Sequence, residues 1–514
     1  MNCVANKAAK NQDDESRESA DICSDHISRV EKSICLMLLC AIGWRQSAIG
    51  LSISLLIMPL NPSARPTSRE PAARPEQVRS PLAVFVAVTL LTGVGAGLGG
   101  MLLALLLHWI QHVAFGYSVG HVISSESFLE GVSDAGPQRR VVVLVVCGLV
   151  AGLGWWALYR YGRALVSIKK AVKSDDPRMP VLSTVVHALL QIVTVALGSP
   201  LGREVAPREI GSVWAGWLSH RAGLTLAESR IMVACGAGAG LAAVYNVPLG
   251  GAVFVLEVLL GTFGWAALVP AVATSAIAAV VAWIGLGNEH QYTVSPLMMS
   301  TPLVVWSALC GPVFGLAAWG FTQLTTRARA QAPKDWRLPV LALLNFAIIG
   351  VLAIEFPQLL GNGKGPAGLS FNSDLTIGLA AILLVLKVAI TVGSLRAGAE
   401  GGLLTPGLAN GALLAIVLGG IWNMIWPGTS PGAFAIIGAA AFLAASMQMP
   451  LTAVVLILEF TRVNHDFLIP ILLAVAGSVS TFKLLATVWA ARAAPGTGGV
   501  KAAGAVMARA GGGQ

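Results

Sequence analysis

Two glycine-rich turns are the segments of this sequence best suited to hold a small ion. They read GSPLGREVAP at residues 198–207 and GAEGGLLTP at residues 398–406, and each leads into a short apolar helix. The start of a helix leaves backbone N–H groups unpaired and carries a partial positive charge, and glycine lets a ligand approach those donors closely. Two such helix starts that point inward would cradle an anion without a fixed cation to trap it. The alternative is that the glycines only allow close helix packing, as small residues do in membranes.

Arg203 and Glu204 interrupt the otherwise apolar stretch 180–218. An ionisable side chain at membrane depth is costly and is therefore a candidate functional group. Glu204 on an anion pathway would compete with the anion for the same N–H donors and would leave when protonated, so we predict that it is a carboxylate gate. The alternative is a helix-end ion-pair network of Arg203, Glu204, Arg208 and Glu209.

Other ionisable residues in apolar runs have simpler interpretations. Glu257 and Glu459 end apolar helices at equivalent positions, where contact with water or a helix cap is favoured over a role in chemistry. His187 lies in an apolar helix, and packing is favoured there over a proton relay. His108 and His112 are four residues apart but lack a third ligand, so no metal site is predicted.

The composition excludes a soluble globular protein. Of the 514 residues 55% are apolar and 11% are charged, whereas soluble domains carry roughly 25% charged residues. A single soluble core also stops growing near about 250–300 residues. The net charge of +9 sits in short segments between apolar runs, which is typical of positive-inside topology and not of a nucleic-acid-binding patch. No convincing GxSxG or HExxH motif occurs, so neither an enzyme nor a cofactor is predicted.

The seven cysteines form no CxxC pair, and several lie inside apolar runs, which indicates small buried side chains and no zinc site or disulfide framework. They are Cys3, Cys23, Cys35, Cys40, Cys147, Cys235 and Cys310.

Two blocks repeat with the same spacing at an offset of 202 residues. They are GAGAGLAAVYNVPLGGAVFVLE at residues 236–257 and GAAAFLAASMQMPLTAVVLILE at residues 438–459, with twelve residues from Gly to Pro and nine from Pro to Glu. A glycine-rich turn precedes each block. Duplicated halves with interrupted helices are typical of transporters, whose site lies where the halves meet near the bilayer midplane.

Apolar runs dominate from residue 81 onward. Several are shorter than the roughly 20 residues that a bilayer of about 30 Å requires, and others are longer and broken by Pro and Gly, so we expect tilted, broken helices around a protected pathway. The runs lie near 82–110, 141–158, 180–198, 210–218, 229–262, 266–286, 302–322, 338–354, 376–394, 403–426, 433–461 and 467–490.

The loops predict the orientation of the chain. Segments 112–138 and 287–302 contain neither Lys nor Arg and should face outside, whereas 160–178 and 327–337 are rich in both and should be cytoplasmic. The same rule places both termini in the cytoplasm, with the chain in a cell inner (plasma) membrane.

Four segments are predicted along the chain: a leader at 1–80, transmembrane repeats at 81–285 and 286–490, and a short flexible tail at 491–514. The leader is polar and disordered at its start, has a doubtful apolar segment at 34–60, and would be absent if translation began at Met58.

These motifs together resemble the CLC family of chloride channels and chloride–proton antiporters, in the prokaryotic form without C-terminal CBS domains. GREVAP at 202–207 is similar to the family's GREGP motif, GGLLTP at 401–406 to its GxFxP motif, and the blocks at 246–258 and 448–461 to its two most recognisable helices. The resemblance covers roughly residues 82–490 and implies an all-α polytopic membrane protein, a CLC-like fold of two inverted-topology repeats. It also implies a homodimer in which each subunit has its own pore for chloride or similar small anions.

The resemblance assigns roles by position. Glu204 would be the external gate. The anion path would be lined through backbone amides, at Gly202, Arg203, Gly402, Leu403 and Leu404.

The sequence departs from the family pattern at four places. Arg163 occupies the position of the serine that contacts the central anion. Val258 stands where proton-coupled members carry a glutamate, and the pore tyrosine has no counterpart in 467–492, where Trp489 is the nearest large aromatic. Glu400 adds a carboxylate beside the second glycine turn.

Two hypotheses on transport remain open. Val258 and the missing tyrosine favour a channel-like or weakly proton-coupled pathway gated by Glu204. The alternative is a proton-coupled chloride antiporter with a non-standard proton route through Glu257, Glu400 or His187.

Overall fold

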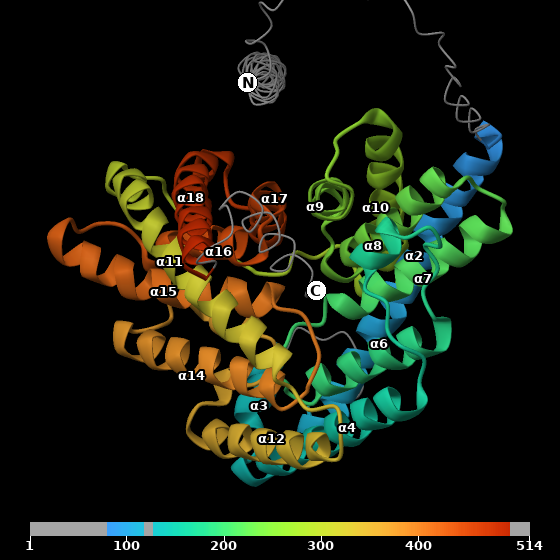
Figure 1. Ribbon diagram of the computed structural model, residues 1–514. Helices are drawn as coiled ribbons and strands as arrows, with labels where there is room; N and C mark the ends of the chain where they lie inside the picture. The colour runs from blue at the N-terminus through green and yellow to red at the C-terminus, as the bar shows by residue number, and fades with distance from the viewer. Residues whose placement is uncertain (1–79, 118–126, 494–514) are drawn as a thin grey trace, which may run out of the picture. The chain divides into compact units, whose positions relative to one another are not determined.

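The computed structural model describes residues 80–117 and 127–493, and this part of the chain is helical (Figure 1). The predicted leader, the doubtful segment 34–60, a start at Met58 and the tail lie outside the described residues, apart from the end of the last helix. The helices of the first half are α2 (Leu82–Phe115), α3 (Phe128–Asp134), α4 (Pro137–Tyr161), α5 (Ile168–Lys173), α6 (Val181–Ala196), α7 (Val205–Arg221), α8 (Leu226–Tyr245), α9 (Pro248–Phe254), the π-helix η1 (Val255–Leu260) and α10 (Trp265–Leu286).

The second half repeats this order of long and short helices. It contains α11 (Thr301–Ala330), α12 (Arg337–Glu355), the short 3-10 helix η2 (Pro357–Leu359), α13 (Lys364–Phe371), α14 (Ile377–Arg396), α15 (Leu404–Ile425), α16 (Pro431–Met447), α17 (Pro450–Thr461), the 3-10 helix η3 (His465–Phe467) and α18 (Leu468–Ala493). The boundary between the repeats at residues 285 and 286 stays a prediction.

Matching contacts recur in the two halves. Helix α7 packs on α8 as α15 packs on α16, and α10 packs on α2 as α18 packs on α11. Asn246 and Gln448, which follow α8 and α16, both take the left-handed backbone conformation, with φ of 54° and 53°. A proline begins the next helix in each case, so the interruption predicted from the sequence falls at the same place in each half.

Small residues bring the central helices together. A Cβ atom on Gly236 of α8 would overlap the carbonyl of Gly211 on α7, and a Cβ atom on Gly438 of α16 would overlap the side chain of Ala415 on α15. Most residues of α8 and α16 are therefore buried by other helices, as the close approach of small residues in membranes allows.

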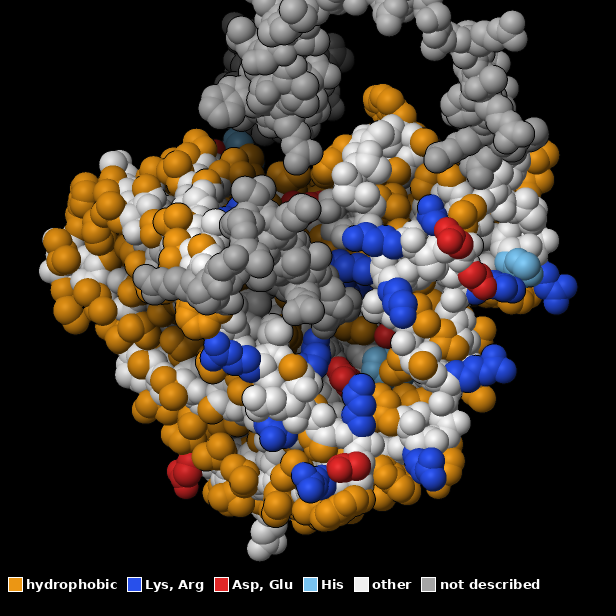
Figure 2. Space-filling view, in the orientation of Figure 1, with side chains coloured by type: hydrophobic (Ala, Val, Ile, Leu, Met, Phe, Trp, Pro, Cys, Tyr) orange, Lys and Arg blue, Asp and Glu red, His pale blue; other side chains and the backbone are white. Residues whose placement is uncertain are grey.

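The other long helices expose apolar side chains. Within the described residues, nine helices are long and apolar enough to cross a membrane, and α6, α16 and α17 are shorter apolar helices. Exposed leucines, valines and isoleucines lie along α2, α4, α11 and α12. Figure 2 shows apolar side chains along the left and lower margins of one face, while Lys and Arg side chains are spread over its middle and right. This distribution suits a protein surrounded by lipid with a polar face toward water.

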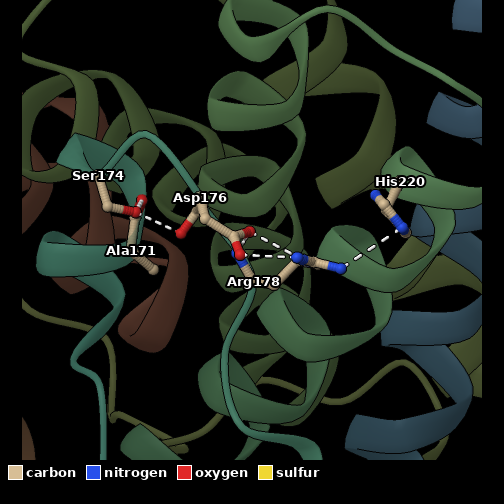
Figure 3. Close-up of polar contacts among 5 residues, drawn as sticks. All are labelled: Ala171, Ser174, Asp176, Arg178 and His220. Atoms are coloured by element: carbon tan, nitrogen blue, oxygen red, sulfur yellow. Dashed lines mark hydrogen bonds and ion pairs between the residues drawn. The ribbon is translucent and has the colours of Figure 1, made fainter.

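The basic segment between α5 and α6 is held by its own side chains (Figure 3). Arg178 donates two hydrogen bonds of 2.8 Å to the carboxylate of Asp176 and lies 3.4 Å from a ring nitrogen of His220. The hydrogen bonds from Arg178 lower the pKa of the Asp176 carboxyl below its usual range. The Ser174 hydroxyl donates to the Ala171 carbonyl at 2.8 Å, which ties the segment to the end of α5.

Candidate functional site

The two glycine-rich turns meet in the structure. Gly202 and Gly402 form an isolated antiparallel bridge, in which the N–H of each donates to the carbonyl of the other, at 2.7 and 2.9 Å. The first turn ends at α7 and the second at α15, so the two helices begin next to each other. The bridge therefore joins a turn from each half of the chain at one point.

The Glu204 carboxylate lies between these helix starts. Glu204 is the residue before α7 and is 0% exposed. Its Oε1 accepts a hydrogen bond of 2.7 Å from the N–H of Leu404, the first residue of α15. Its Oε2 is buried and has no hydrogen-bond partner among the described residues. The carboxylate thus takes the place of an anion at a helix N-terminus, with one oxygen unsatisfied.

The bridging glycines make room for this carboxylate. A Cβ atom on either Gly202 or Gly402 would overlap the oxygens of Glu204. The predicted alternative, that these glycines serve only helix packing, omits this contact, because the group they approach is a carboxylate and not a helix.

Arg203 and Arg208 contact groups other than the Glu204 carboxylate. The Arg203 guanidinium lies over the ring of Tyr245 at 5.2 Å, and the Tyr245 hydroxyl lies 3.1 Å from Oγ1 of Thr405. The Arg208 Nε donates to the backbone carbonyl of Glu204 at 3.0 Å. Neither arginine forms an ion pair with Glu204 in the described part of the chain, so the charge of that carboxylate is left available to a proton or to the helix starts.

Tyr245 and Thr405 were not among the residues predicted from the sequence. Thr405 belongs to the second glycine turn, and Tyr245 ends α8 directly before Asn246. Only the fold brings them together, and no spacing in the sequence signals the pair.

Glu257 and Glu459 cap helices in the opposite half. Glu257 accepts hydrogen bonds from the N–H groups of Leu451 and Thr452 at 3.0 and 2.7 Å, at the start of α17. Glu459 accepts from Leu249 and Gly250 at 2.9 and 2.6 Å, at the start of α9. Each carboxylate therefore caps the start of its partner helix, whereas the sequence favoured contact with either water or a cap.

Glu400 and Arg163 have contacts with residues other than Glu204. The Tyr159 hydroxyl donates to Glu400 at 3.2 Å, and the Arg329 Nε lies 3.6 Å from the same carboxylate. The Arg163 side chain is exposed, while its backbone N–H donates to the Ser183 hydroxyl at 2.9 Å. Among the described residues no group of three His, Cys, Asp or Glu side chains could hold a metal ion.

His187 lies in a buried polar cluster. Its Nδ1 is 2.9 Å from Oε2 of Glu209, and the Gln191 amide lies 2.9 Å from the same nitrogen. Glu209 also lines a pocket between α5, α7 and η1, whose wall includes Lys169, Arg208 and Val258. Trp489, in contrast, is 43% exposed and makes an edge contact with Trp319, with the ring centroids 5.7 Å apart.

The fold and this arrangement define an all-helical polytopic membrane protein with a buried carboxylate between two opposed helix starts. The family model described as "Voltage gated chloride channel" matches residues 142–483, which is more than half of the chain. The chain therefore belongs to the CLC family of chloride channels and chloride–proton antiporters, which is a family of transport proteins and not of enzymes.

Relatives named for two different activities resemble the chain. A "Putative chloride channel protein ClcB-like" from Ralstonia nicotianae is 29% identical over 65% of this chain and 80% of that protein. A "Voltage-gated ClC-type chloride channel ClcB" from Citrobacter koseri is also 29% identical, over 65% of this chain and 82% of that protein. An "H(+)/Cl(-) exchange transporter ClcA" from Cronobacter sakazakii is 28% identical over 78% of this chain and 86% of that protein.

Solved structures confirm the predicted fold class. A slow cyanobacterial Cl⁻/H⁺ antiporter matches with a TM-score of 0.67 at 18% identity, covering 84% of this chain and 99% of that one. A eukaryotic CLC transporter matches with a TM-score of 0.63 at 19% identity, covering 78% and 72%. At these identities the likeness concerns the fold alone.

Proposed function

We propose that this protein carries chloride or a similar small anion across the membrane, through a channel-like or weakly proton-coupled pathway that Glu204 gates. The observation that carries the proposal is the hydrogen bond of 2.7 Å from the Leu404 N–H to the buried Glu204 carboxylate. Gly202, Arg203, Gly402, Leu403 and Leu404 are the proposed lining of the anion path. Membership of the CLC family supports chloride as the anion.

The proposed gate works by competition at a helix start. While Glu204 is charged, its carboxylate holds the donor of α15 by a charge-assisted hydrogen bond, which is roughly twice as strong as a neutral one. Protonation removes the charge and weakens this bond, so the side chain leaves and an anion takes the donor. The unsatisfied Oε2 of Glu204 offers a site for the proton. Anion flux should therefore rise as the pH falls.

Substitution of Glu204 tests the gate. In liposomes, Glu204→Gln and Glu204→Ala should carry anions at neutral pH at least as fast as the wild type does in acid, with a flat pH profile. Glu130→Gln is the matched control, because Glu130 is exposed and glutamine keeps its capping role at the start of α3. A folded Glu204→Gln protein with the wild-type pH profile would remove Glu204 from the gate.

The second candidate function is proton-coupled exchange by a non-standard route. Val258 in the pocket wall argues for weak coupling, because proton-coupled members of the family are expected to carry a carboxylate there. The buried His187–Glu209 pair at the same pocket favours some proton transfer. Simultaneous measurement of chloride efflux and proton uptake in liposomes separates the two functions, since stoichiometric uptake would exclude a passive channel.

The assembly and orientation are part of the proposal. We place the chain in a plasma membrane as a homodimer with both termini in the cytoplasm. The exposed apolar side chains on α2, α4, α11 and α12 support a lipid-facing or subunit-facing surface. Cross-linking in native membranes should give one product of twice the protomer mass.

A further inference from the structure

The pocket between α5, α7 and η1 contains a single carboxylate among its described wall residues. Glu209 reaches it from α7, Lys169 from α5 and Val258 from η1. The pocket has about 60 Å³ that water can occupy, and one water needs roughly 10–15 Å³ by the same measure. Water can therefore reach a carboxylate that is only 8% exposed.

The Glu209 carboxylate shares a proton position with His187. Oε2 of Glu209 and Nδ1 of His187 are 2.9 Å apart, and Nε2 of Gln191 lies 2.9 Å from this nitrogen and 3.2 Å from this oxygen. A proton between the two atoms can rest on the imidazole, which then donates to the carboxylate, or on the carboxyl, which then donates to the imidazole. Oε1 of Gln191 is buried without a partner among the described residues, so the cluster has an acceptor to spare.

Glu209 is connected to the proposed gate through one helix. Glu204 immediately precedes α7 and Glu209 lies five residues further on, which corresponds to about 7.5 Å along a helix axis. Arg208 links the two positions, since its Nε donates to the Glu204 carbonyl at 3.0 Å while its side chain lines the pocket.

The charges around the pair come from four elements. Arg208 of α7 acts on Glu209, and Lys169 of α5 lies near Arg208. Glu400 and Arg329, from the second half of the chain, act on His187 and form an ion pair with each other at 3.6 Å.

We propose that Glu209 and His187 together form the proton-accepting site at the inner end of the transport pathway, in place of a carboxylate at position 258. This inference rests on the proposed function of Glu204 as the gate. A hydronium ion in the pocket gives its proton to the pair and becomes water. The pair then passes the proton to the Glu204 carboxylate, and that side chain, now uncharged, leaves the Leu404 N–H. The basic segment 160–178, which the positive-inside rule assigns to the cytoplasm, contributes Ser167, Ile168 and Lys169 to the pocket wall.

Purified wild type, Glu209→Gln and His187→Gln in liposomes test the transport step. An outward chloride gradient should move protons through the wild type, and either substitution should reduce proton movement at least about tenfold while chloride flux stays within about twofold. Glu130→Gln should change neither flux. Wild-type proton movement in a folded Glu209→Gln or His187→Gln protein would overturn the inference, and so would a wild type that carries chloride without protons at every pH.

A second measurement is independent of transport. A pH jump on detergent-solubilised protein, followed by infrared difference spectroscopy, should show a proton arriving on a carboxyl or an imidazole, and this signal should be lost in both variants. A wild type that shows the signal but carries no anion would contradict the proposed function and leave this protonation site standing. A spectrum unchanged by Glu209→Gln would overturn the site itself. Thermal unfolding of each variant tests whether the Glu209–His187 pair has only a structural role between α6 and α7. In that case each substitution would lower the stability and leave proton movement unchanged.

Discussion

At the scale of single residues, the site depends on the space beside Glu204. The motifs placed Glu204, Gly202 and Leu404 among the candidate site residues, because all three lie in the two glycine-rich turns, and they predicted that Glu204 competes for helix-start N–H donors. They did not single out the Leu404 N–H as the donor that the carboxylate occupies. That contact joins residues 200 positions apart, and no local pattern encodes such a pairing. The Tyr245–Thr405 contact escaped prediction for the same reason.

Replacement of Gly402 by alanine should displace the gate. The added methyl would overlap the Glu204 carboxylate, and a packed interior yields to such an overlap only by moving a side chain. We expect Gly402→Ala to raise chloride flux at neutral pH toward that of Glu204→Ala and to flatten the pH profile. Chloride efflux from liposomes between pH 5 and pH 8 measures both effects.

Gly320→Ala is the control for this substitution. Gly320 lies inside α11, and a Cβ atom there would meet no atom within 4 Å, so alanine should leave transport unchanged and stabilise the helix by about 0.5–1 kcal/mol. A folded Gly402→Ala protein with the wild-type pH profile would contradict the prediction. It would show that gating does not depend on the position of the Glu204 carboxylate beside Gly402.

At the scale of elements, the apolar runs predicted nearly every long helix, and the prolines predicted the breaks at Pro248 and Pro450. The short helices α3, α5 and α13 were not predicted, because 6 to 8 residues are too few to show a periodic pattern. The sequence also did not predict which helix starts Glu257 and Glu459 contact. Contact with water or a cap was favoured for each residue, but the helix that each one caps belongs to the other half of the chain.

The exchanged caps should hold α9 and α17 together. Each carboxylate neutralises the helix start that faces it, and the two helices pack against each other. Loss of an N-terminal cap costs about 0.5–2 kcal/mol, so Glu257→Ala and Glu459→Ala should each lower the free energy of unfolding by about 1–2 kcal/mol. Denaturant unfolding in detergent measures the change, with Glu257→Gln and Glu459→Gln expected to restore part of it.

A double-substitution cycle completes this test. Because the capped helices touch, the two losses should not add, and the interaction energy should be about 0.5 kcal/mol or more. Glu355→Ala is the matched control, since Glu355 is exposed at the end of α12 and should change stability by less than about 0.5 kcal/mol. Unfolding of both cap variants at the wild-type denaturant concentration would show that the caps contribute no stability.

At the scale of the whole molecule, the apolar composition and the charges of the loops predicted a membrane protein. The surface agrees with this prediction, since apolar side chains lie along the left and lower margins of a face over whose middle and right basic residues are spread (Figure 2). The duplicated blocks predicted two related halves, and the Gly202–Gly402 bridge joins them. Orientation rests on the loops alone, because a helix exposes similar apolar surface whichever way it crosses the bilayer.

Labelling of single cysteines should establish that orientation. In a chain whose seven native cysteines are replaced by alanine, Met298→Cys should react with a membrane-impermeant maleimide on intact cells, because Met298 is 86% exposed in the segment predicted to face outside. Lys170→Cys should react only after the cells are opened, because the exposed Lys170 lies in the predicted cytoplasmic segment 160–178. The unsubstituted cysteine-free chain gives the background. The opposite labelling pattern would show that the protein has the inverted orientation. The Glu209–His187 pocket would then face the outside, and protons would have to enter the proposed pathway from that compartment.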